Sequence, residues 1–156
     1  MIMRIFILAL VALFISAPAF AADKLDCQVV AEAVNPTEAG GTNDYVNLTD
    51  GTISATATAE DEFTVPTEVI VHSLSVEVDV APTANDTWVF TVVDDSVATP
   101  VTCSITGASD TSCISGSFVS ATVLGGSDLM VLIDSSTGTA DPAAAAEARI
   151  SFCISK

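Results

Sequence analysis

The four cysteines of this chain offer the best-defined chemistry in its sequence. In an exported protein, which the first residues indicate (below), an even number favours two disulfide bonds, and four cysteines allow three pairings. Cys103 and Cys113 flank a turn centred on Ala108, so a hairpin there would place their sulfur atoms opposite each other. Cys27 is then left for Cys153, which requires the first and last strands to be neighbours. Whether these structural disulfides join one subunit or two stays open.

The other reactive residues do not indicate a catalytic site. His72 is the single histidine, so a Ser-His-Asp arrangement would depend on it, but it lies in a strand pattern without a Gly-x-Ser-x-Gly elbow. Asp94-Asp95 and Glu60-Asp61-Glu62 could supply the carboxylate pair of a glycosidase. Neighbours in a strand point to opposite faces, however, and turns carry such pairs for solubility. We therefore expect a protein that is not an enzyme.

Calcium is the ligand that the acidic residues fit best. Asp44, Asn47 and Asp50 lie close together in the sequence and offer the hard oxygen donors that calcium prefers. Their spacing is not that of an EF-hand loop, and a solvated turn is the alternative interpretation. We expect no required cofactor, with these three residues as the calcium candidates.

The first residues have the pattern of a secretory signal peptide. Arg4 supplies a positive charge, Ile5 to Ile15 form an apolar run, and Ala19-Phe20-Ala21 provides an Ala-x-Ala cleavage signal. The apolar run is about eleven residues long, whereas a membrane-spanning helix needs about twenty. We expect residues 1–21 to be removed and the mature protein to be secreted to the extracellular space, the cell surface or the periplasm, without inserting into a membrane.

The charge of the expected mature chain is strongly negative. Twenty acidic residues against three basic ones, Lys24, Arg149 and Lys156, leave a formal charge of −17. Binding to nucleic acid or to anionic lipid depends on clustered Lys and Arg, which this chain lacks. We therefore do not expect the protein to bind nucleic acid or anionic lipid.

Alternating apolar and polar residues recur along the chain and are interrupted at regular intervals by turn-forming residues. The expected strands are Cys27 to Val34, Asp44 to Leu48, Thr52 to Glu60, Glu68 to Val80, Thr87 to Val93, Thr99 to Thr106, Ser112 to Ser115, Phe118 to Leu124, Leu129 to Asp134 and Ala148 to Ser155. This pattern predicts an all-β fold, a two-layer antiparallel β-sandwich of jelly-roll topology with about 8–10 strands. We assign residues 22–43 to an N-terminal strand with a flexible joint at Asn35 to Thr42, and residues 44–156 to the sandwich domain.

Several strands carry an apolar stripe that predicts the core. The inward-facing residues are expected to be Leu74, Val76, Val78 and Val80, then Trp88, Phe90 and Val92, and finally Ile150, Phe152 and Ile154. The segment from Leu129 to Ile133 is apolar at every position, which indicates a central strand covered on both faces or an occluded contact surface, and the covered strand is favoured. Asp141 to Glu147 is the one segment with a helical pattern.

The same segments resemble a β-sandwich domain of phage structural proteins and bacterial surface proteins that is generally left uncharacterised. The matching pieces are 71–78, 81–92, 101–107 with Cys113, 119–123 and 126–129. That family pattern is similar to the trimeric jelly rolls of the tumour-necrosis-factor and complement type. The resemblance implies a jelly-roll fold and a protein that acts by assembly and binding. The chain's own leader and its cysteine-bearing strand at each end favour a small autonomous secreted subunit.

The expected function is contact with other molecules. Thr52 to Ala59 has no Lys or Pro to guard it if it lies at a sheet edge, so another chain could add a strand there. Residues 23–34 could be that strand, or could fold onto their own sheet, locked by Cys27 and Cys153, which is the favoured interpretation. We expect a self-assembling structural subunit of a filament, coat or surface layer. The alternative is an adhesin-like module, monomeric or trimeric, that binds a glycan or a surface protein through Ala81 to Asp86 and Ser135 to Asp141.

Overall fold

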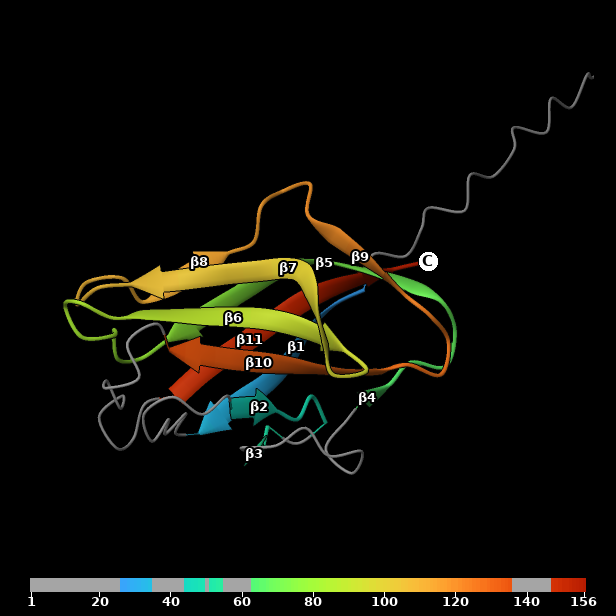
Figure 1. Ribbon diagram of the computed structural model, residues 1–156, viewed down its shortest axis with the longest axis horizontal. Coiled ribbons are helices and arrows are strands. Elements are labelled where there is room, and N and C mark those ends of the chain that lie inside the picture. The colour runs from blue at the N-terminus through green and yellow to red at the C-terminus, as the bar shows by residue number, and fades with distance from the viewer. Residues whose placement is uncertain (1–25, 35–43, 50, 55–62, 136–146) are drawn as a thin grey trace, which may run out of the picture.

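The described part of the chain is all-β and forms two antiparallel sheets (Figure 1). The computed structural model describes residues 26–34, 44–49, 51–54, 63–135 and 147–156. None of these residues lies in a helix, so the all-β class is confirmed. A search of the same residues for a helix long and apolar enough to span a membrane finds none.

The strands follow the predicted order closely. They are β1 (Asp26–Val34), β2 (Asp44–Val46), β3 (Ile53–Ser54), β4 (Phe63–Thr64), β5 (Val69–Val78), β6 (Thr87–Asp94), β7 (Val97–Thr106), β8 (Ser112–Ile114), β9 (Ser120–Val123), β10 (Asp128–Ser135) and β11 (Glu147–Ser155). The two-residue strand β4 is the one that the sequence pattern did not predict. It pairs with the start of β10, where Phe63 lies opposite Leu129.

Each sheet joins segments that are distant in the sequence. Sheet A has the order β1-β11-β5-β8, and β9 pairs with β5 further along the same side. Sheet B has the order β3-β2-β10-β6-β7, and β4 pairs with β10. The first strand therefore pairs with the last one, so the segment at 26–34 folds onto its own sheet. The two layers pack over each other, with sheet B nearer the viewer in Figure 1.

One hydrophobic core lies between the two sheets. Alternate residues of each long strand enter it, as in β7, where Val101, Cys103 and Ile105 are buried and the residues between them are exposed. Phe90 of sheet B and Phe152 of sheet A are among the largest side chains that the core buries. The period of two places successive side chains on opposite faces, so each strand contributes one stripe to this core.

A bulge in β5 keeps its apolar residues facing inward. Val71 and Leu74 are both fully buried although they are three residues apart, which a regular strand would not allow. The register on β11 shifts between Ser151 and Cys153, and Ser73 adopts a positive φ of 57° at this point. The extra residue restores the alternation, so that the segment after it continues the stripe.

The core departs from expectation at Val80 and agrees with it at Met130. Val80 was expected in the stripe of β5, but it follows the end of that strand and is 37% exposed, so this prediction is wrong. The prediction that the apolar run of β10 is covered on both faces holds at Met130, which is 1% exposed between the inward-facing Leu129 and Val131. Leu132 is half-buried.

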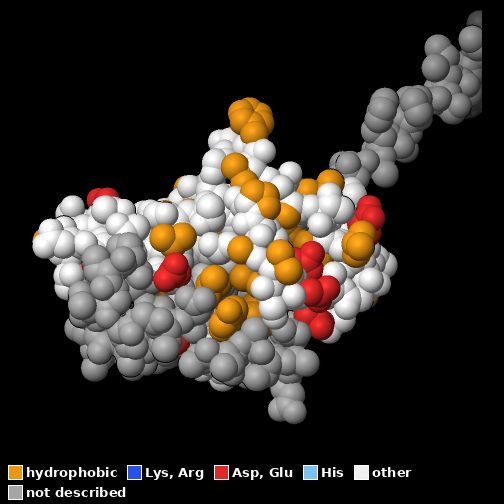
Figure 2. Space-filling model, viewed as in Figure 1, with side chains coloured by type: hydrophobic (Ala, Val, Ile, Leu, Met, Phe, Trp, Pro, Cys, Tyr) orange, Lys and Arg blue, Asp and Glu red, His pale blue; other side chains and the backbone are white. Residues whose placement is uncertain are grey.

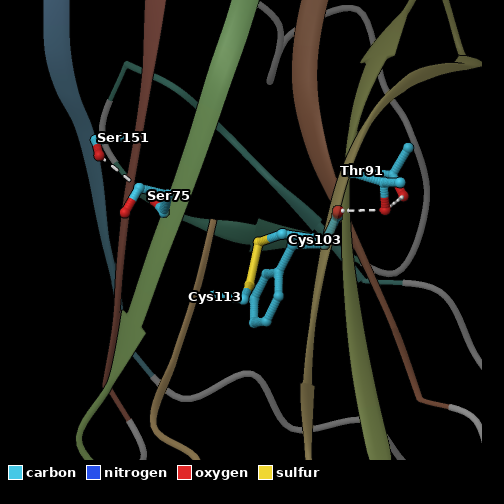
Figure 3. The surroundings of a disulfide bond; sticks show 7 residues. Ser75, Thr91, Cys103, Cys113 and Ser151 are labelled. Atoms are coloured by element: carbon cyan, nitrogen blue, oxygen red, sulfur yellow. Dashed lines mark hydrogen bonds between the residues drawn. A yellow bond between two sulfur atoms is a disulfide. The ribbon is translucent and has the colours of Figure 1, made fainter. Parts of the chain in front are cut away.

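Two disulfide bonds each secure an edge strand of sheet A. Cys27 lies directly opposite Cys153 in the register of β1 and β11, and these residues are bonded. Cys103 of β7 is bonded to Cys113 of β8 across the sandwich. Figure 3 shows this second bond between the two layers, with Ser75 on the sheet A side and Thr91 on the sheet B side. Two disulfides indicate an oxidising, extracellular-type environment.

The predicted hairpin between Cys103 and Cys113 does not form. β7 pairs with β6 in sheet B, whereas β8 pairs with β5 in sheet A, so the segment between them crosses from one layer to the other. Cys103 points into the core with its neighbours on β7, and Cys113 packs against that core from the other sheet. The two sulfur atoms therefore meet because both side chains face inward, and not because they are opposite in one ladder.

The positive φ of Ser73 predicts an unusual order of substitution effects. Ser73→Gly should leave the free energy of unfolding within about 1 kcal/mol of the wild type, because glycine adopts this φ without a steric penalty. Ser73→Val should lose about 2 kcal/mol, since a β-branched residue is strained there. Urea unfolding measures both, and Ser75→Val, at a half-buried regular position of the same strand, is the control. Equal losses for the two Ser73 variants would contradict the bulge.

The two disulfides should contribute unequally to stability. Their sequence separations are 126 for Cys27–Cys153 and 10 for Cys103–Cys113, and the chain-entropy model gives about 5 and about 3 kcal/mol for loops of these sizes. Replacing each pair with alanine and measuring unfolding by urea tests this order. Because both bonds lie within one chain, electrophoresis without reductant should show a monomer band, and a ladder that collapses on reduction would contradict the pairing.

Candidate interaction surface

His72 forms its closest polar contact with the next residue of the same strand. Its Nδ1 lies 2.8 Å from Ser73 Oγ, and its strand partners are Ser120 on β9 and Cys153 on β11. Neither partner carries the carboxylate that orients the imidazole of a catalytic triad. Ser73 has its own structural task at the bulge, so this contact is best explained by the local geometry of β5.

The carboxylates of Asp94 and Asp95 lie at the turn between β6 and β7. Asp95 and Ser96 both have positive φ, which is the conformation of a two-residue hairpin turn. Asp95 Oδ1 accepts a hydrogen bond from the Asp128 backbone N–H at 2.9 Å, and its Oδ2 accepts one from Ser127 Oγ at 3.1 Å. The side chain of Asp95 therefore ties this turn to the start of β10, which is a structural role.

Two of the three calcium candidates, Asp44 and Asn47, lie among the described residues. Asp44 lies in β2 and is buried, while the Oδ1 of Asn47 accepts hydrogen bonds from the N–H and the Oγ1 of Thr49. Asp50 lies outside the described residues. Within the part of the chain that the structure describes, no group of three or more His, Cys, Asp or Glu residues could hold a metal ion.

A small hollow lies on the outer face of sheet A, where β5 ends and β11 begins. Its volume is about 150 Å³, and it is lined by Glu77, Val78, Asp79, Glu147 and Arg149. Asp79 Oδ1 accepts a hydrogen bond from the Glu147 N–H at 2.6 Å, which holds the start of β11 beside the end of β5. Pockets for small molecules usually exceed about 300 Å³, so this hollow is too small to bury such a ligand.

The open edges of the two sheets are a more informative feature. Among the described strands, sheet A ends in β1 on one side and in β8 and β9 on the other, and sheet B ends in β3 and β7. β8 and β9 contain no charged residue and no proline, which are the usual guards of an edge strand. β3, the described part of the segment from Thr52 to Ala59, has none either, whereas β7 carries Pro100 in its irregular part.

The edges formed by β7, β8 and β9 lie on one side of the sandwich, which we call the uncharged side. β7 contacts both β8 and β9 across the two layers, and the Cys103–Cys113 bond joins β7 to β8. Residues 96–127, which include all three strands, contain a single charged residue, Asp110. In the whole chain 15% of the residues are charged, so this side is strongly depleted of charge.

Exposed hydrophobic side chains are concentrated on the uncharged side. Phe118 is fully exposed in the turn between β8 and β9, where the Val119 N–H donates to the Gly116 carbonyl at 3.0 Å. Ile114 at the end of β8 is 74% exposed, and Leu124 after β9 is 62% exposed. In Figure 2 a run of hydrophobic side chains descends from the top of the molecule, between the positions of β8 and β9, and a second group lies lower on the same face. Three large apolar side chains exposed on one side of the sandwich make that side a candidate contact surface.

Several predicted sites lie outside the described residues, and one surface that the structure shows was not predicted. The leader at 1–21, the joint from Asn35 to Thr42, Glu60-Asp61-Glu62, Ala55 to Ala59 and the segment 136–146, which holds most of the second loop and of the helical pattern, lie outside the described residues. The uncharged side was not predicted. Its signal is visible in the sequence as the charge-free interval between Ser96 and Ser127, broken only at Asp110.

The chain was compared with models of protein families, with curated protein sequences and with solved structures, and nothing matches it.

The role of Asp95 predicts a loss of stability that differs by substitution. Asp95→Gly keeps a residue that tolerates the positive φ but removes both acceptors, so the free energy of unfolding should fall by about 1 kcal/mol. Asp95→Asn keeps the Oδ1 acceptor and should lose less. Thermal and urea unfolding measure both, with Ser96→Gly as the control at the adjacent turn position. A fully stable Asp95→Gly variant would mean that the side chain does not tie β10 to the turn.

Proposed function

We propose that this protein is a secreted, non-enzymatic structural subunit that assembles with copies of itself outside the cytoplasm, at the cell surface or in a filament or coat. The observation that carries the proposal is the open edge formed by β8 and β9, which is uncharged and has no proline. An unguarded edge presents free backbone N–H and C=O groups to another chain. Strand pairing between subunits uses these groups for affinity and leaves specificity to the side chains.

We also propose a jelly-roll topology for the sandwich. If β8 and β9 count as one interrupted strand and the short β3 and β4 are set aside, eight principal strands remain. The first pairs with the last, the second with the seventh, the third with the sixth and the fourth with the fifth. This is the pairing that results when a long hairpin wraps into two layers. It supports the similarity to trimeric jelly rolls of the tumour-necrosis-factor and complement type.

Export is part of the proposal and has independent physical support. Two disulfides favour an oxidising compartment, and the pattern of residues 1–21 is typical of a cleaved signal peptide. Mass spectrometry of material collected from the medium or the periplasm would identify the residue at which the mature chain begins.

Self-assembly predicts that the size of the mature protein in solution depends on its concentration. Light scattering after size-exclusion chromatography should show the average mass rising across a hundred-fold range of concentration at physiological salt. Electron microscopy of the most concentrated sample distinguishes closed oligomers from filaments. A strictly monomeric protein at every concentration, with and without added calcium, would overturn the proposed function.

A further inference from the structure

We infer that a second copy of this chain binds the uncharged side of the sandwich, with Phe118 at the centre of the contact. The inference rests on the proposed function and specifies which surface carries self-assembly. It does not use the edge at β3 or an exchanged β1. The partner and the surface follow from three properties of β7, β8 and β9: their charge, their exposed side chains and their free edges.

The distribution of charge identifies the kind of partner. The chain carries 20 acidic and four basic residues, and 96–127 contain one of these 24. A basic partner would be attracted to the acidic remainder of the surface and would gain nothing from a neutral contact. A neutral contact is instead what an acidic partner requires, because carboxylates brought face to face repel each other. A second copy of this chain is such an acidic partner, and it is always present. Contact through the uncharged side lets two copies meet while most of their carboxylates stay apart.

The exposed side chains supply the apolar part of the contact. Phe118 is fully exposed, Ile114 is 74% exposed and Leu124 is 62% exposed. An aromatic side chain such as phenylalanine buries roughly 150–250 Å² when it is covered. In a twofold-symmetric contact each of these residues is covered twice, once in each copy. Large aromatic side chains near the centre of an interface are the residues that most often dominate its affinity.

The backbone of this side is held ready for pairing. β8 and β9 are hydrogen-bonded to β5 on one side and form the edge of sheet A on the other. The Cys103–Cys113 bond fixes β8 to β7, so the two edges keep their relative position. A surface that is already ordered loses less conformational entropy on binding than a mobile one. The contact therefore combines strand pairing with an apolar anchor on a rigid base.

The expected response to salt follows from the same charges. When two copies associate through a neutral surface, the remaining carboxylates still repel at longer range. Salt screens this repulsion, so association should become tighter as the salt concentration rises. A contact made by ion pairs would become weaker under the same change. Association that tightens with salt would therefore argue against a contact made by ion pairs, and the variants at Phe118 identify the surface.

The decisive experiment compares three variants of the mature protein with the wild type. Phe118→Asp places a carboxylate at the proposed centre, and Phe118→Ser removes the ring without adding charge. Thr64→Asp is the matched control, because it adds one carboxylate at an exposed strand residue of β4, which joins sheet B on the side away from β7. Because Phe118 is fully exposed, its variants should melt at the same temperature as the wild type.

Sedimentation equilibrium at 20, 150 and 500 mM sodium chloride, on the order of 20, 8 and 4 Å of screening length, measures the dissociation constant of each protein. We expect Phe118→Asp to raise it at least tenfold, Phe118→Ser by a smaller factor and Thr64→Asp by less than about threefold. For the wild type it should fall as salt rises.

Two results would overturn the inference in different ways. If the wild type self-associates and all three variants associate equally well, assembly stands but uses another surface. If the wild type is monomeric at every concentration and salt, both the inference and the proposed function fail. Binding of the monomeric wild type to zwitterionic phosphatidylcholine vesicles, lost in Phe118→Asp, would then assign the exposed ring to a lipid surface.

Discussion

The two sheets depend on one constraint, which is that every long strand must turn its apolar stripe toward the same core. A strand has a period of two, so a single misplaced residue would expose every core side chain that follows it. β5 shows how the chain meets this constraint, because the bulge at Ser73 lets Val71 and Leu74 both point inward. The register is also shifted between β1 and β11, where the extra residue lies in β1, and between β6 and β7, where the extra residues lie in β7. In β5 the irregularity is what allows a long strand to serve one core.

The disulfides complement the core at the places where it is weakest. Edge strands have one hydrogen-bonded neighbour, and both edges of sheet A are fastened by a cystine: β1 through Cys27 and β8 through Cys113. Sheet B has no disulfide within it, and its long strands β6, β7 and β10 pair over many residues. The covalent bonds therefore fasten both edges of sheet A, at the short strand β8 and at the first strand β1.

The sequence predicts most of this fold because its patterns are local. Turn residues and alternation locate ten of the strands to within a few residues, and the stripe Trp88, Phe90 and Val92 is buried as expected. What alternation cannot reveal is which sheet a strand joins. The error at Cys103 and Cys113 arose there, since a short loop between two strands suggests a hairpin and gives no sign that the chain crosses layers. Val80 was misplaced because the alternation in the sequence continues for two residues past Val78, where β5 ends.

The candidate site was harder to predict than the fold because it is defined by what is missing. Reactive residues such as His72 and Asp95 attract attention in a sequence, yet the structure gives them local tasks at a bulge and a turn. The uncharged side has no motif. It becomes visible once β7, β8 and β9 are known to share one side of the sandwich, because the charge-free interval then becomes a surface.

The bond between Cys27 and Cys153 also has a mechanical consequence. The Cα atoms of these residues are 4.0 Å apart, although 126 positions separate them along the chain. Fully stretched, that length would measure roughly 400 Å. A tensile load applied outside the two cysteines passes directly through the sulfur atoms, so neither sheet is peeled apart and no slack is released. Under a load applied at these two ends, the chain between the cysteines is not extended for as long as this cystine stays oxidised.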